Sequence, residues 1–306
     1  MSLTVVGSIA FDAVETPSGV RPRLLGGSAV HFSLASSFFA ETRIVGPVGD
    51  DFGRDEFEVL HARGVNTDDV ERVPGGKTFF WSGRYERDFN VRHTLITELN
   101  VFETFEPKLS VQSRGADVLF LANIQPDLQR QVLEQCGRAR FTALDSMNLW
   151  IDIAHESLVK TIRLVDCLIV NDSEIKQLTD EPNLVRAAQA VLELGPRVVV
   201  AKQGEYGAAM FTRDSFFALP AYPTPDVVDP TGAGDTFAGG FVGHVAAHGE
   251  EDLRSALAYG TALASFNVEA FGTERLQTLT PDEVAERVAE LERITRFDAA
   301  PVTLRA

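Results

Sequence analysis

The stretch VDPTGAGDTFAGG at residues 228–240 combines a glycine-rich turn with the start of a helix. Gly232 and Gly234 lack the side chains that would keep a ligand away from the backbone, so neighbouring N–H groups can converge on one point. Asp235 is predicted to begin the helix, whose N-terminus carries unpaired donors and about half a positive charge. The stretch therefore predicts a binding site for a phosphate or another oxyanion.

The alternative is an ordinary glycine-rich loop in which Asp235 serves only as a helix N-cap. Gly239, Gly240 and Gly243 follow within the same predicted helix, and each costs on the order of 1 kcal/mol relative to alanine. Such a cost indicates very close packing or a crowded ligand site. Other phosphate motifs do not fit, because no G-x-x-x-x-G-K-[ST] occurs and Phe237 stands where a dinucleotide fingerprint needs its third glycine.

The stretch resembles the second signature of the PfkB/ribokinase family of sugar and nucleoside kinases, which reads approximately D-T-x-G-A-G-D-x-F. The resemblance implies that the amides of Gly232, Ala233 and Gly234 hold the transferring phosphoryl group and that Asp235 takes the proton of the acceptor hydroxyl. It also implies ATP with Mg²⁺ as the phosphoryl donor and a monovalent cation, K⁺, beside Asp229. These roles are chemically reasonable, because phosphoryl transfer needs mainly positioning and charge stabilisation.

The composition of the 306-residue chain, 44% hydrophobic and 24% charged, is typical of a globular protein with one large α/β domain and an appendage. A net charge of −16 argues against nucleic acid or anionic membrane as a partner, since both are bound through excess Lys and Arg. The spacing of Cys136 and Cys167 indicates free, buried thiols. The apolar run at residues 3–6 is too short for a membrane span and lacks the basic flank of a signal peptide, so we expect a cytoplasmic protein.

Residues 3–6 are predicted to form a buried strand that leads into a turn at Asp12, where ligands collect in an open α/β sheet. The family resemblance implies that Asp12 hydrogen-bonds hydroxyl groups of the acceptor, and the alternative is an ordinary turn residue. An Asn often precedes this Asp by two residues in the family, but Ala10 occupies that place here.

The segment GGSAVH at residues 26–31 resembles the first family signature and is predicted to open a helix that extends to about residue 39, capped by Ser28. The resemblance implies that Gly26 and Gly27 let the acceptor approach. His31 is a candidate acceptor contact, and the alternative is a packed helix residue. Family members tend to carry Lys at the position of Ser28 and Asn at the position of His31. The acceptor specificity of this chain can therefore not be inferred from that of any one member.

Residues 77–87 and 94–101 are rich in Thr, aromatic and branched residues, and no helix separates them. This pattern predicts a pair of antiparallel strands that interrupts the alternation of strands and helices. The resemblance implies a lid over the acceptor site, formed by about 13–24 and 76–103. Phe80 is then a candidate acceptor contact. Its aromatic neighbours could also pair two protomers into a homodimer, and the alternative is a small hydrophobic core within the lid itself.

Strands and helices alternate after the lid, which is the pattern of a parallel sheet covered on both faces. Strands are expected at 117–122, 140–145, 167–170 and 197–202, with helices at 126–136 and 151–164. Asn171 and Glu174 match the family's N-x-x-E motif, which implies that Asn171 lies near the phosphates and that Glu174 acts on Mg²⁺ through water. Without that motif, Glu174 would be a first-turn helix stabiliser, with Asp172 or Ser173 as the cap.

The resemblance also assigns residues to the nucleotide: Lys202, the glycines of a G-x-x-G turn at Gly204 and Gly207, and Asn267 in a late helix that is expected over 253–271 with Gly272 as its cap. Together these features predict a single ribokinase-like α/β domain over 1–306. The expected architecture is a three-layer sandwich with a mostly parallel central sheet and a small β-rich lid.

The sequence predicts MgATP-dependent phosphorylation of a hydroxyl group on a small sugar or sugar-like polyol. The first alternative is a nucleoside kinase of the adenosine-kinase type. The second is an inactive relative that binds a nucleotide or a sugar, and an intact Asp235 argues against it. The identity of the acceptor stays open at this point.

Overall fold

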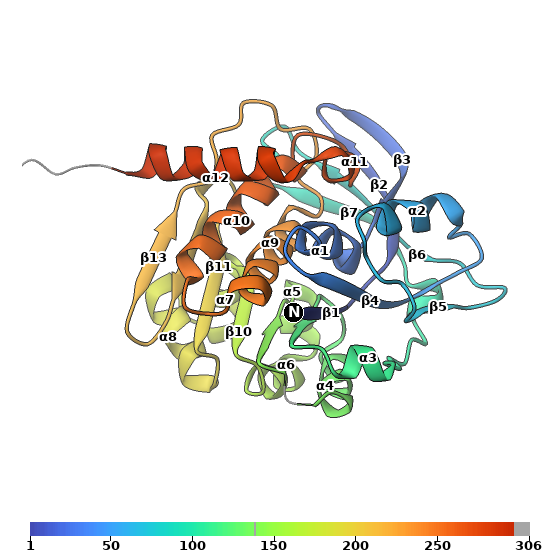
Figure 1. Cartoon of the computed structure of the whole chain (residues 1–306), viewed down its shortest axis with the longest axis horizontal. Coiled ribbons are helices and arrows are strands. Elements are labelled where there is room, and N and C mark those ends of the chain that lie inside the picture. The colour runs from blue at the N-terminus through green and yellow to red at the C-terminus, as the bar shows by residue number, and fades with distance from the viewer. Residues whose placement is uncertain (138, 297–306) are drawn as a thin grey trace, which may run out of the picture.

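The computed structural model describes residues 1–137 and 139–296, and it contains a nine-stranded sheet and a four-stranded sheet (Figure 1). The order of the large sheet is β13-β12-β11-β10-β9-β8-β1-β4-β5. Its strands are β1 (Ser2–Val6), β4 (Glu41–Val48), β5 (Val70–Arg72), β8 (Val118–Leu121), β9 (Phe141–Leu144), β10 (Cys167–Asn171), β11 (Val198–Lys202), β12 (Ala208–Phe211) and β13 (Phe216–Leu219). Only the pairings β11–β12 and β12–β13 are antiparallel within this described sheet, so the prediction of a mostly parallel sheet is confirmed.

The central strands are apolar on both faces because helices cover both sides. In β8, Val118 and Phe120 join one hydrophobic cluster, whereas Leu119 and Leu121 join the other. This is the two-residue alternation of a strand buried on both sides. Phe32 stacks on Phe120 with ring centroids 4.1 Å apart and so fixes its helix against the sheet.

The helices divide between the two faces and complete the three layers. The first layer packs through α1 (Ser28–Ser36), α2 (Arg54–Ala62), α9 (Ala233–His248), α10 (Leu253–Asn267), α11 (Glu274–Thr278) and α12 (Pro281–Thr295). The opposite layer packs through α4 (Pro126–Gln135), α5 (Asn148–Ile153), α6 (His155–Ile162), α7 (Asp172–Thr179) and α8 (Leu184–Leu194). A short helix, α3 (Val111–Arg114), precedes β8.

Helix α9 runs through the interior, and its glycines are required by backbone contacts on two sides. A Cβ atom at Gly239 would collide with the carbonyl oxygen of Phe32 in α1. A Cβ atom at Gly240 would lie 2.9 Å from the Cα atom of Gly260 in α10. The close packing predicted from these glycines is therefore what the structure has.

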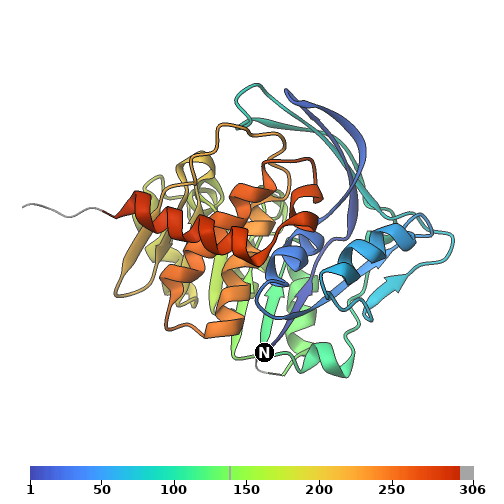
Figure 2. The same cartoon turned by 45° about the horizontal axis from the view of Figure 1, so that its top comes forward.

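The four-stranded sheet has the order β3-β2-β6-β7 and forms the lid. Its strands are β2 (Ala10–Thr16), β3 (Gly19–Gly26), β6 (Phe79–Tyr85) and β7 (Arg92–Glu98), where segments near 13–24 and 76–103 were expected. Strand β2 is parallel to β6, and the other two pairings are antiparallel. Figure 2 shows these strands standing away from the large sheet as a separate layer.

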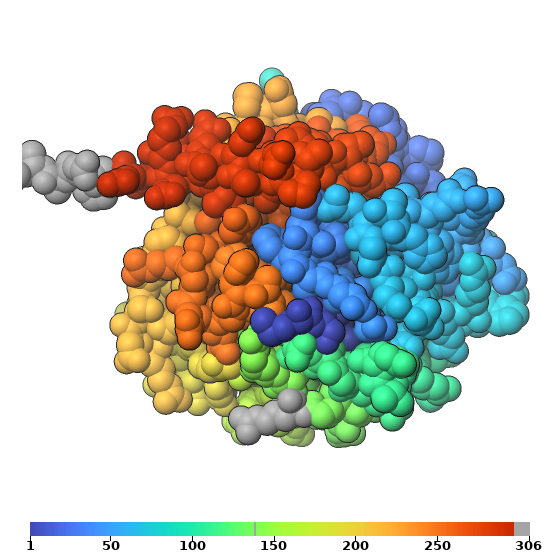
Figure 3. All heavy atoms as spheres, in the orientation of Figure 1, coloured from blue at the N-terminus to red at the C-terminus, as the bar shows by residue number. Residues whose placement is uncertain are grey.

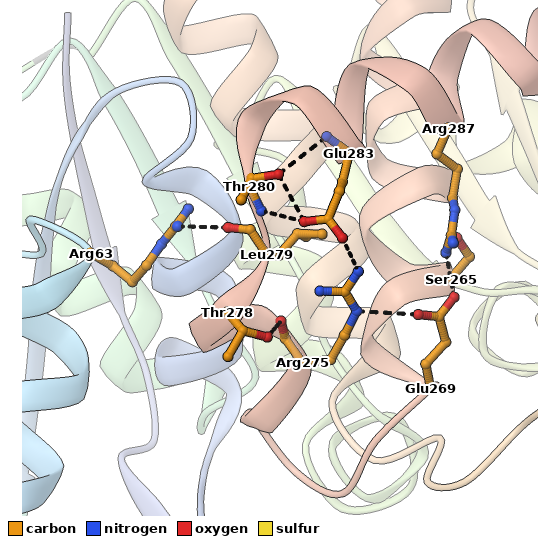
Figure 4. A network of polar contacts seen from close by, with 9 residues as sticks. All are labelled: Arg63, Ser265, Glu269, Arg275, Thr278, Leu279, Thr280, Glu283 and Arg287. Carbon is orange, nitrogen blue, oxygen red and sulfur yellow. Dashed lines mark hydrogen bonds and ion pairs between the residues drawn. The ribbon is translucent and has the colours of Figure 1, made fainter.

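The C-terminal helix α12 lies across α10 on the face seen in Figure 3, where it forms a continuous surface with it. A network of charged groups fixes this arrangement (Figure 4). Glu269 accepts hydrogen bonds from Arg275 at 3.3 Å and from Arg287 at 2.6 Å, and Arg275 also pairs with Glu283 at 2.6 Å. The network holds the segment that follows α10, which contributes to the site described below.

Several predicted helix boundaries are wrong for identifiable reasons. The helix expected at 151–164 is two helices, because the backbone at Ala154 leaves the helical region with φ −137°. Gly27, not Ser28, is the N-cap of α1, since the hydroxyl of Ser28 lies 3.0 Å from that of Ser8. Helix α1 ends at Ser36 rather than near residue 39.

Cys167 is buried, as predicted, whereas Cys136 is only partly buried, and both are free thiols. Within residues 1–137 and 139–296, no helix has the length and apolar character needed to cross a membrane.

Candidate active site

Helix α9 begins at Ala233, two residues before the predicted start, and Gly232 is its N-cap with φ 75°. A side chain at Gly232 would be strained by this left-handed conformation and would also collide with the imidazole of His31. Ala233 donates its N–H to the carbonyl of Pro230 at 3.2 Å. Within the described chain, the N–H groups of Gly232 and Gly234 have no acceptor, so two of the three predicted amides are free for an anion.

A buried network supports this turn from below. The Nδ1 atom of His31 lies 3.1 Å from Oδ1 of Asn267, which also accepts from the hydroxyl of Thr236 at 3.0 Å. The amide of Asn267 donates to the carbonyl of Thr231 at 2.8 Å. Burial lowers the pKa of His31 to about 4, so its imidazole is neutral and its Nδ1 donates to the amide oxygen.

This network contains two of the predicted site residues, and both are buried. Asn267 is 0% exposed, and its oxygen and nitrogen are both occupied within the protein. Asn267 therefore supports the turn from within the protein, and its assignment to the nucleotide stays a prediction. His31 is 1% exposed and packs against Gly232, which makes it a support of the turn rather than an exposed acceptor contact.

Four ionisable groups gather beside the turn, at the carboxyl ends of the strands. The ammonium of Lys202 donates to Oδ2 of Asp145 at 2.9 Å, and a Cβ atom at Gly234 would lie 3.1 Å from the same nitrogen. Burial raises the pKa of Asp145 to about 6 and also raises that of Asp235, against the opposing charge of Lys202. Burial acts to lower the pKa of Lys202, but Asp145, Glu174 and Asp235 outweigh it and raise that pKa.

Asn171 and Glu174 form a reciprocal capping box at the start of α7. The Asn171 side chain accepts the N–H of Glu174 at 2.8 Å, and the Glu174 carboxylate accepts the N–H of Asn171 at 2.8 Å. Asn171 is thus the N-cap, and the prediction of Asp172 or Ser173 is wrong. Burial raises the pKa of Glu174 to about 7, with Lys202 acting in the opposite direction. The register pairs Asn171 with Lys202, which places the capping box next to the lysine.

Gly204 and Gly207 lie in a short 3-10 turn that directly follows β11. The N–H of Gln203 donates to the carbonyl of Gly207 at 2.8 Å, which closes the turn before β12. Asn90 at the tip of the lid donates to the carboxylate of Glu205 in this turn at 3.1 Å. The lid therefore touches the side of the molecule to which the nucleotide was assigned.

Asp12 lies in lid strand β2 rather than in a turn after the first strand. Its side chain is 6% exposed, and a Cβ atom at Gly26 would collide with its carboxylate. Burial, together with the charges of Asp229 and Asp235, raises the pKa of Asp12 to about 7, and a hydrogen bond from the Gly27 backbone lowers it. Gly26 of the first signature thus makes room for Asp12, and Gly27 donates its N–H to it.

The strand register decides which lid aromatics face the site. Asp12 is paired with Trp81, whereas Phe80 is paired with Phe11. Phe11 belongs to the main hydrophobic core, and Phe80 packs against that core. Adjacent residues of a strand point to opposite faces, so Trp81 shares the face of Asp12 and Phe80 does not. The structure does not bring Phe80 to the acceptor side.

Asp229 holds the approach to the turn. It is 0% exposed, and its two carboxylate oxygens accept the N–H groups of Thr231 and Gly272, each at 2.9 Å. Gly272 is therefore not the cap of α10, which ends at Asn267. Asp229 ties the turn to the segment after α10.

Three further residues belong to this site: Asp145 and Arg92, to which the sequence assigns no role, and Tyr85, which the sequence offers only as one of several lid aromatics that could cover a substrate or pair two protomers. Asp145 follows β9 at the strand end, a position that is itself a signal for ligand-binding residues. Tyr85 reaches the turn from the lid, with its hydroxyl 3.1 Å from that of Thr231. Arg92 is paired with Tyr85 in the neighbouring strand. The last two depend on the register of the lid, which spacing alone does not determine.

Comparison with known proteins agrees with this arrangement. A family model described as pfkB family carbohydrate kinase matches residues 3–279. The chain is 27% identical to a cytidine kinase of Thermococcus kodakarensis over 79% of this chain and 87% of the relative. It is also 27% identical to a nucleoside kinase of Methanothermobacter thermautotrophicus over 92% of both chains.

Among solved structures, the nucleoside kinase of Methanocaldococcus jannaschii superposes with a TM-score of 0.78 at 21% identity, covering 94% of this chain and 98% of that chain. This likeness establishes the ribokinase fold. The family match spans both signatures, the capping box and the lid. The chain therefore belongs to the pfkB family of carbohydrate kinases, whose members are phosphotransferases that act on hydroxyl groups.

Proposed function

We propose that this protein transfers the γ-phosphoryl group of ATP to a hydroxyl group of a small sugar or sugar-like polyol. The observation that carries the proposal is the N-terminus of α9, which presents the Asp235 carboxylate together with the unpaired N–H groups of Gly232 and Gly234. A base and an oxyanion site on one helical turn are what in-line transfer to a hydroxyl requires.

The residues divide the chemistry between them. Asp235 accepts the proton of the acceptor hydroxyl, and burial raises its pKa, which makes the carboxylate a stronger base. The two N–H groups donate to the phosphoryl oxygens, and Lys202 places a positive charge beside Gly234. Asp12 accepts hydrogen bonds from acceptor hydroxyls on the lid side.

The carboxylates fit the magnesium ion that accompanies ATP. Within residues 1–137 and 139–296, no group of three or more His, Cys, Asp or Glu side chains could hold a metal by itself. Mg²⁺ commonly takes one or two carboxylates, water and substrate phosphates as ligands. Glu174, and Asp145 beside it, would hold the ion in that way, and when bound it would neutralise charge on the phosphates. Asn171, Gly204 and Gly207 would border the nucleotide.

The second candidate is a nucleoside acceptor, and Trp81 favours it. Its indole lies on the face of the lid that carries Asp12, where a base could stack on it while Asp12 holds the ribose hydroxyls. Two relatives named cytidine kinase and nucleoside kinase support this candidate. Trp81→Ala should raise the acceptor KM for nucleosides far more than for free sugars.

The test is an ADP-release screen with MgATP over pentoses, hexoses, inositols, cytidine and other nucleosides, with Asp235→Asn as the blank. The proposal is supported if the wild type releases ADP with a sugar or polyol and the Asp235→Asn variant does not. Turnover confined to nucleosides selects the second candidate. If no acceptor releases ADP above the blank while MgATP still binds, the protein is a nucleotide-binding relative and the proposal fails.

Two further parts of the proposal concern K⁺ and assembly. The buried carboxylate of Asp229 accepts one N–H at each oxygen, which leaves lone pairs for a monovalent cation. All seven residues of the lid edge strand β7 are exposed, including Leu95 at 51% and Ile96 at 47%, which supports homodimer formation through this edge. The K⁺ part is tested by comparing kcat in K⁺ with kcat in tetramethylammonium. The homodimer part is tested by comparing the sedimentation of Leu95→Lys with that of the wild type.

A further inference from the structure

The peptide unit between Thr231 and Gly232 is held at its carbonyl end by one side chain. The amide nitrogen of Asn267 donates to the carbonyl oxygen of Thr231 at 2.8 Å. Within residues 1–137 and 139–296, no backbone N–H of α9 bonds to this oxygen. Asn267 therefore supplies the hydrogen bond that the helix does not.

This contact sets the direction of one donor of the phosphate-binding turn. A trans peptide is planar, so its C=O and N–H bonds point in opposite directions. Because the oxygen of Thr231 is turned toward the buried side chain of Asn267, the N–H of Gly232 points away from it. That N–H is one of the two free donors of the turn.

The backbone alone does not fix this direction. Turning the peptide over changes the φ angle of Gly232, which is 75° here, and a glycine adopts φ values of either sign at little cost. A partner that holds the carbonyl of Thr231 is therefore needed to keep the N–H on one side.

The amide group of Asn267 is itself held in one orientation. Its Oδ1 atom lies 3.1 Å from Nδ1 of His31 and accepts from the hydroxyl of Thr236 at 3.0 Å. Asn267 and Thr236 are 0% exposed and His31 is 1% exposed, so water does not compete for these bonds. Turning the amide over would bring its NH₂ group against two donors and its oxygen against the carbonyl of Thr231. The network thus has a single arrangement.

A fixed donor matters more to the reaction than to the binding of ATP. The transition state of phosphoryl transfer spreads negative charge over three equatorial oxygens. Donors that are already aimed at those oxygens stabilise this charge without any reorganisation. If the N–H of Gly232 could turn away, part of that stabilisation would be lost while MgATP still bound.

We propose that Asn267 is a positioning residue that, through the carbonyl of Thr231, aims the N–H of Gly232 at the transferring phosphoryl group. His31 and Thr236 serve the same end, because they hold the amide of Asn267. The inference rests on the proposed function, since it concerns the same turn. A direct contact between Asn267 and the nucleotide would instead act on the affinity for MgATP.

The first experiment uses Asn267→Asp, which replaces the donor nitrogen with an oxygen of similar size. An ionised carboxylate would repel the carbonyl of Thr231 and attract the N–H of Gly232, so the peptide should turn over. At about pH 8 we expect kcat to fall by roughly 10–10³-fold, with the KM for MgATP changed less than about three-fold.

The pH dependence of this variant adds a readout that a purely structural role would not move. Burial raises the pKa of the introduced carboxyl group, and its protonated form can again donate to the carbonyl of Thr231. The ratio of kcat in Asn267→Asp to kcat in the wild type should therefore rise as pH falls from about 9 to about 6.

The second experiment compares His31→Asn with His31→Leu. The two new side chains have the same shape and leave the same space beside Gly232, but only the Asn amide can donate to Oδ1 of Asn267 as Nδ1 of His31 does. We expect His31→Asn to keep kcat within about three-fold of the wild type and His31→Leu to lose roughly ten-fold.

Gln135→Glu is the matched control for the change from amide to carboxyl. The Gln135 amide donates to the carbonyl of Pro107 at 2.6 Å and accepts the N–H of Leu109 at 3.2 Å, so it holds backbone groups as Asn267 does. Gln135 ends α4, which leads from β8 back to the start of β9, and therefore lies at the opposite edge of the sheet from the turn. The variant should lower the melting temperature and leave kcat unchanged.

The inference is overturned if Asn267→Asp turns over within about three-fold of the wild type at about pH 8, or if Gln135→Glu loses as much. A loss confined to the KM for MgATP would make Asn267 a nucleotide contact. A kcat ratio that does not change with pH, or equal kcat in His31→Asn and His31→Leu, would also overturn it.

A crystal structure of Asn267→Asp, grown at about pH 8, shows the direction of the Gly232 N–H without any turnover. An unchanged peptide orientation would overturn the inference even if kcat fell. Failure of the proposed function, seen as an inactive wild type, is therefore distinguishable from failure of this inference.

Discussion

The hydroxyl of Tyr85 lies 3.1 Å from the hydroxyl of Thr231, which joins the lid directly to the residue before the phosphate-binding turn. Tyr85 is only 9% exposed, so this contact is shielded from water. Burial raises the pKa of its phenol, and the neutral phenol oxygen accepts the hydrogen bond that the hydroxyl of Thr231 donates. Opening of the lid at this point must break the bond.

Tyr85→Phe should loosen the lid without disturbing the turn. A neutral hydrogen bond contributes about 0.5–1.5 kcal/mol, so we expect the acceptor KM to rise by roughly 2–10-fold and MgATP hydrolysis without acceptor to increase. Tyr259→Phe is the control, because that ring packs on Phe39 and the main hydrophobic cluster and not on the turn. Equal behaviour of the two variants in steady-state kinetics would show that the contact does not hold the lid.

Asp235→Asn should remove turnover and leave the MgATP site intact. Loss of a general base lowers kcat by roughly 10²–10⁴-fold, whereas the N–H groups of Gly232 and Gly234 and the fold remain. Asp214→Asn, on an exposed loop, is the matched control. Single-turnover kinetics and calorimetry with MgATP measure the two effects, and near-normal kcat in Asp235→Asn would remove it from the role of base.

The two turn glycines should differ in their tolerance of alanine. In Gly232→Ala the new methyl group would be strained by the left-handed backbone, φ 75°, and would collide with the ring of His31. The variant should therefore have both a lower melting temperature and a lower MgATP affinity. Gly234→Ala meets only the flexible end of Lys202 at 3.1 Å, so it should fold normally and lose mainly phosphate affinity. Thermal denaturation and calorimetry distinguish the two; identical melting temperatures would contradict the strain at Gly232.

Asp12 should make the ligand-free protein less stable as pH rises. Its pKa is raised from 3.8 to about 7 in the folded state. Its favourable contribution to folding is therefore fully present below pH 3.8 and is lost as pH rises through about 7.

Asp12→Asn keeps an acceptor for the Gly27 N–H and removes the titration. The variant should therefore gain stability over the wild type above pH 7, on the order of a few kcal/mol, and show no gain at pH 4. Denaturant unfolding at several pH values measures this difference. A gain that does not change with pH would mean that Asp12 titrates normally in the folded protein.

The sheet and the turn could be predicted because each depends on short-range patterns. Apolar runs such as Val118–Leu121 favour strands buried on both faces, and Gly232 and Gly234 lack the side chains that would cover their backbone donors. Helix caps are harder to predict. Ser28 has the side chain of a typical N-cap, but its hydroxyl forms a hydrogen bond with the hydroxyl of Ser8, twenty residues away in the chain. Tertiary partners decide such cases.

The parts of the site that could not be predicted depend on strand register. Phe80 and Trp81 are neighbours of similar character, and only the pairing with β2 decides that Trp81 faces Asp12. A shift of one residue would exchange them. The buried environment of Asn267 could not be predicted for a related reason, since its partners, His31 and Thr236, come from two other helices that no local pattern links to it.

The glycine contacts of α9 have a consequence for how the molecule moves. With backbone against backbone at Gly239 on one side and at Gly240 on the other, α9 has no compressible side-chain layer through which to slide. We therefore expect the phosphate-binding turn at its end to stay in place and motion during a catalytic cycle to be confined to the lid. Amide hydrogen exchange should record this division, with slow exchange along α9 in every ligand state and ligand-dependent protection concentrated in β6 and β7.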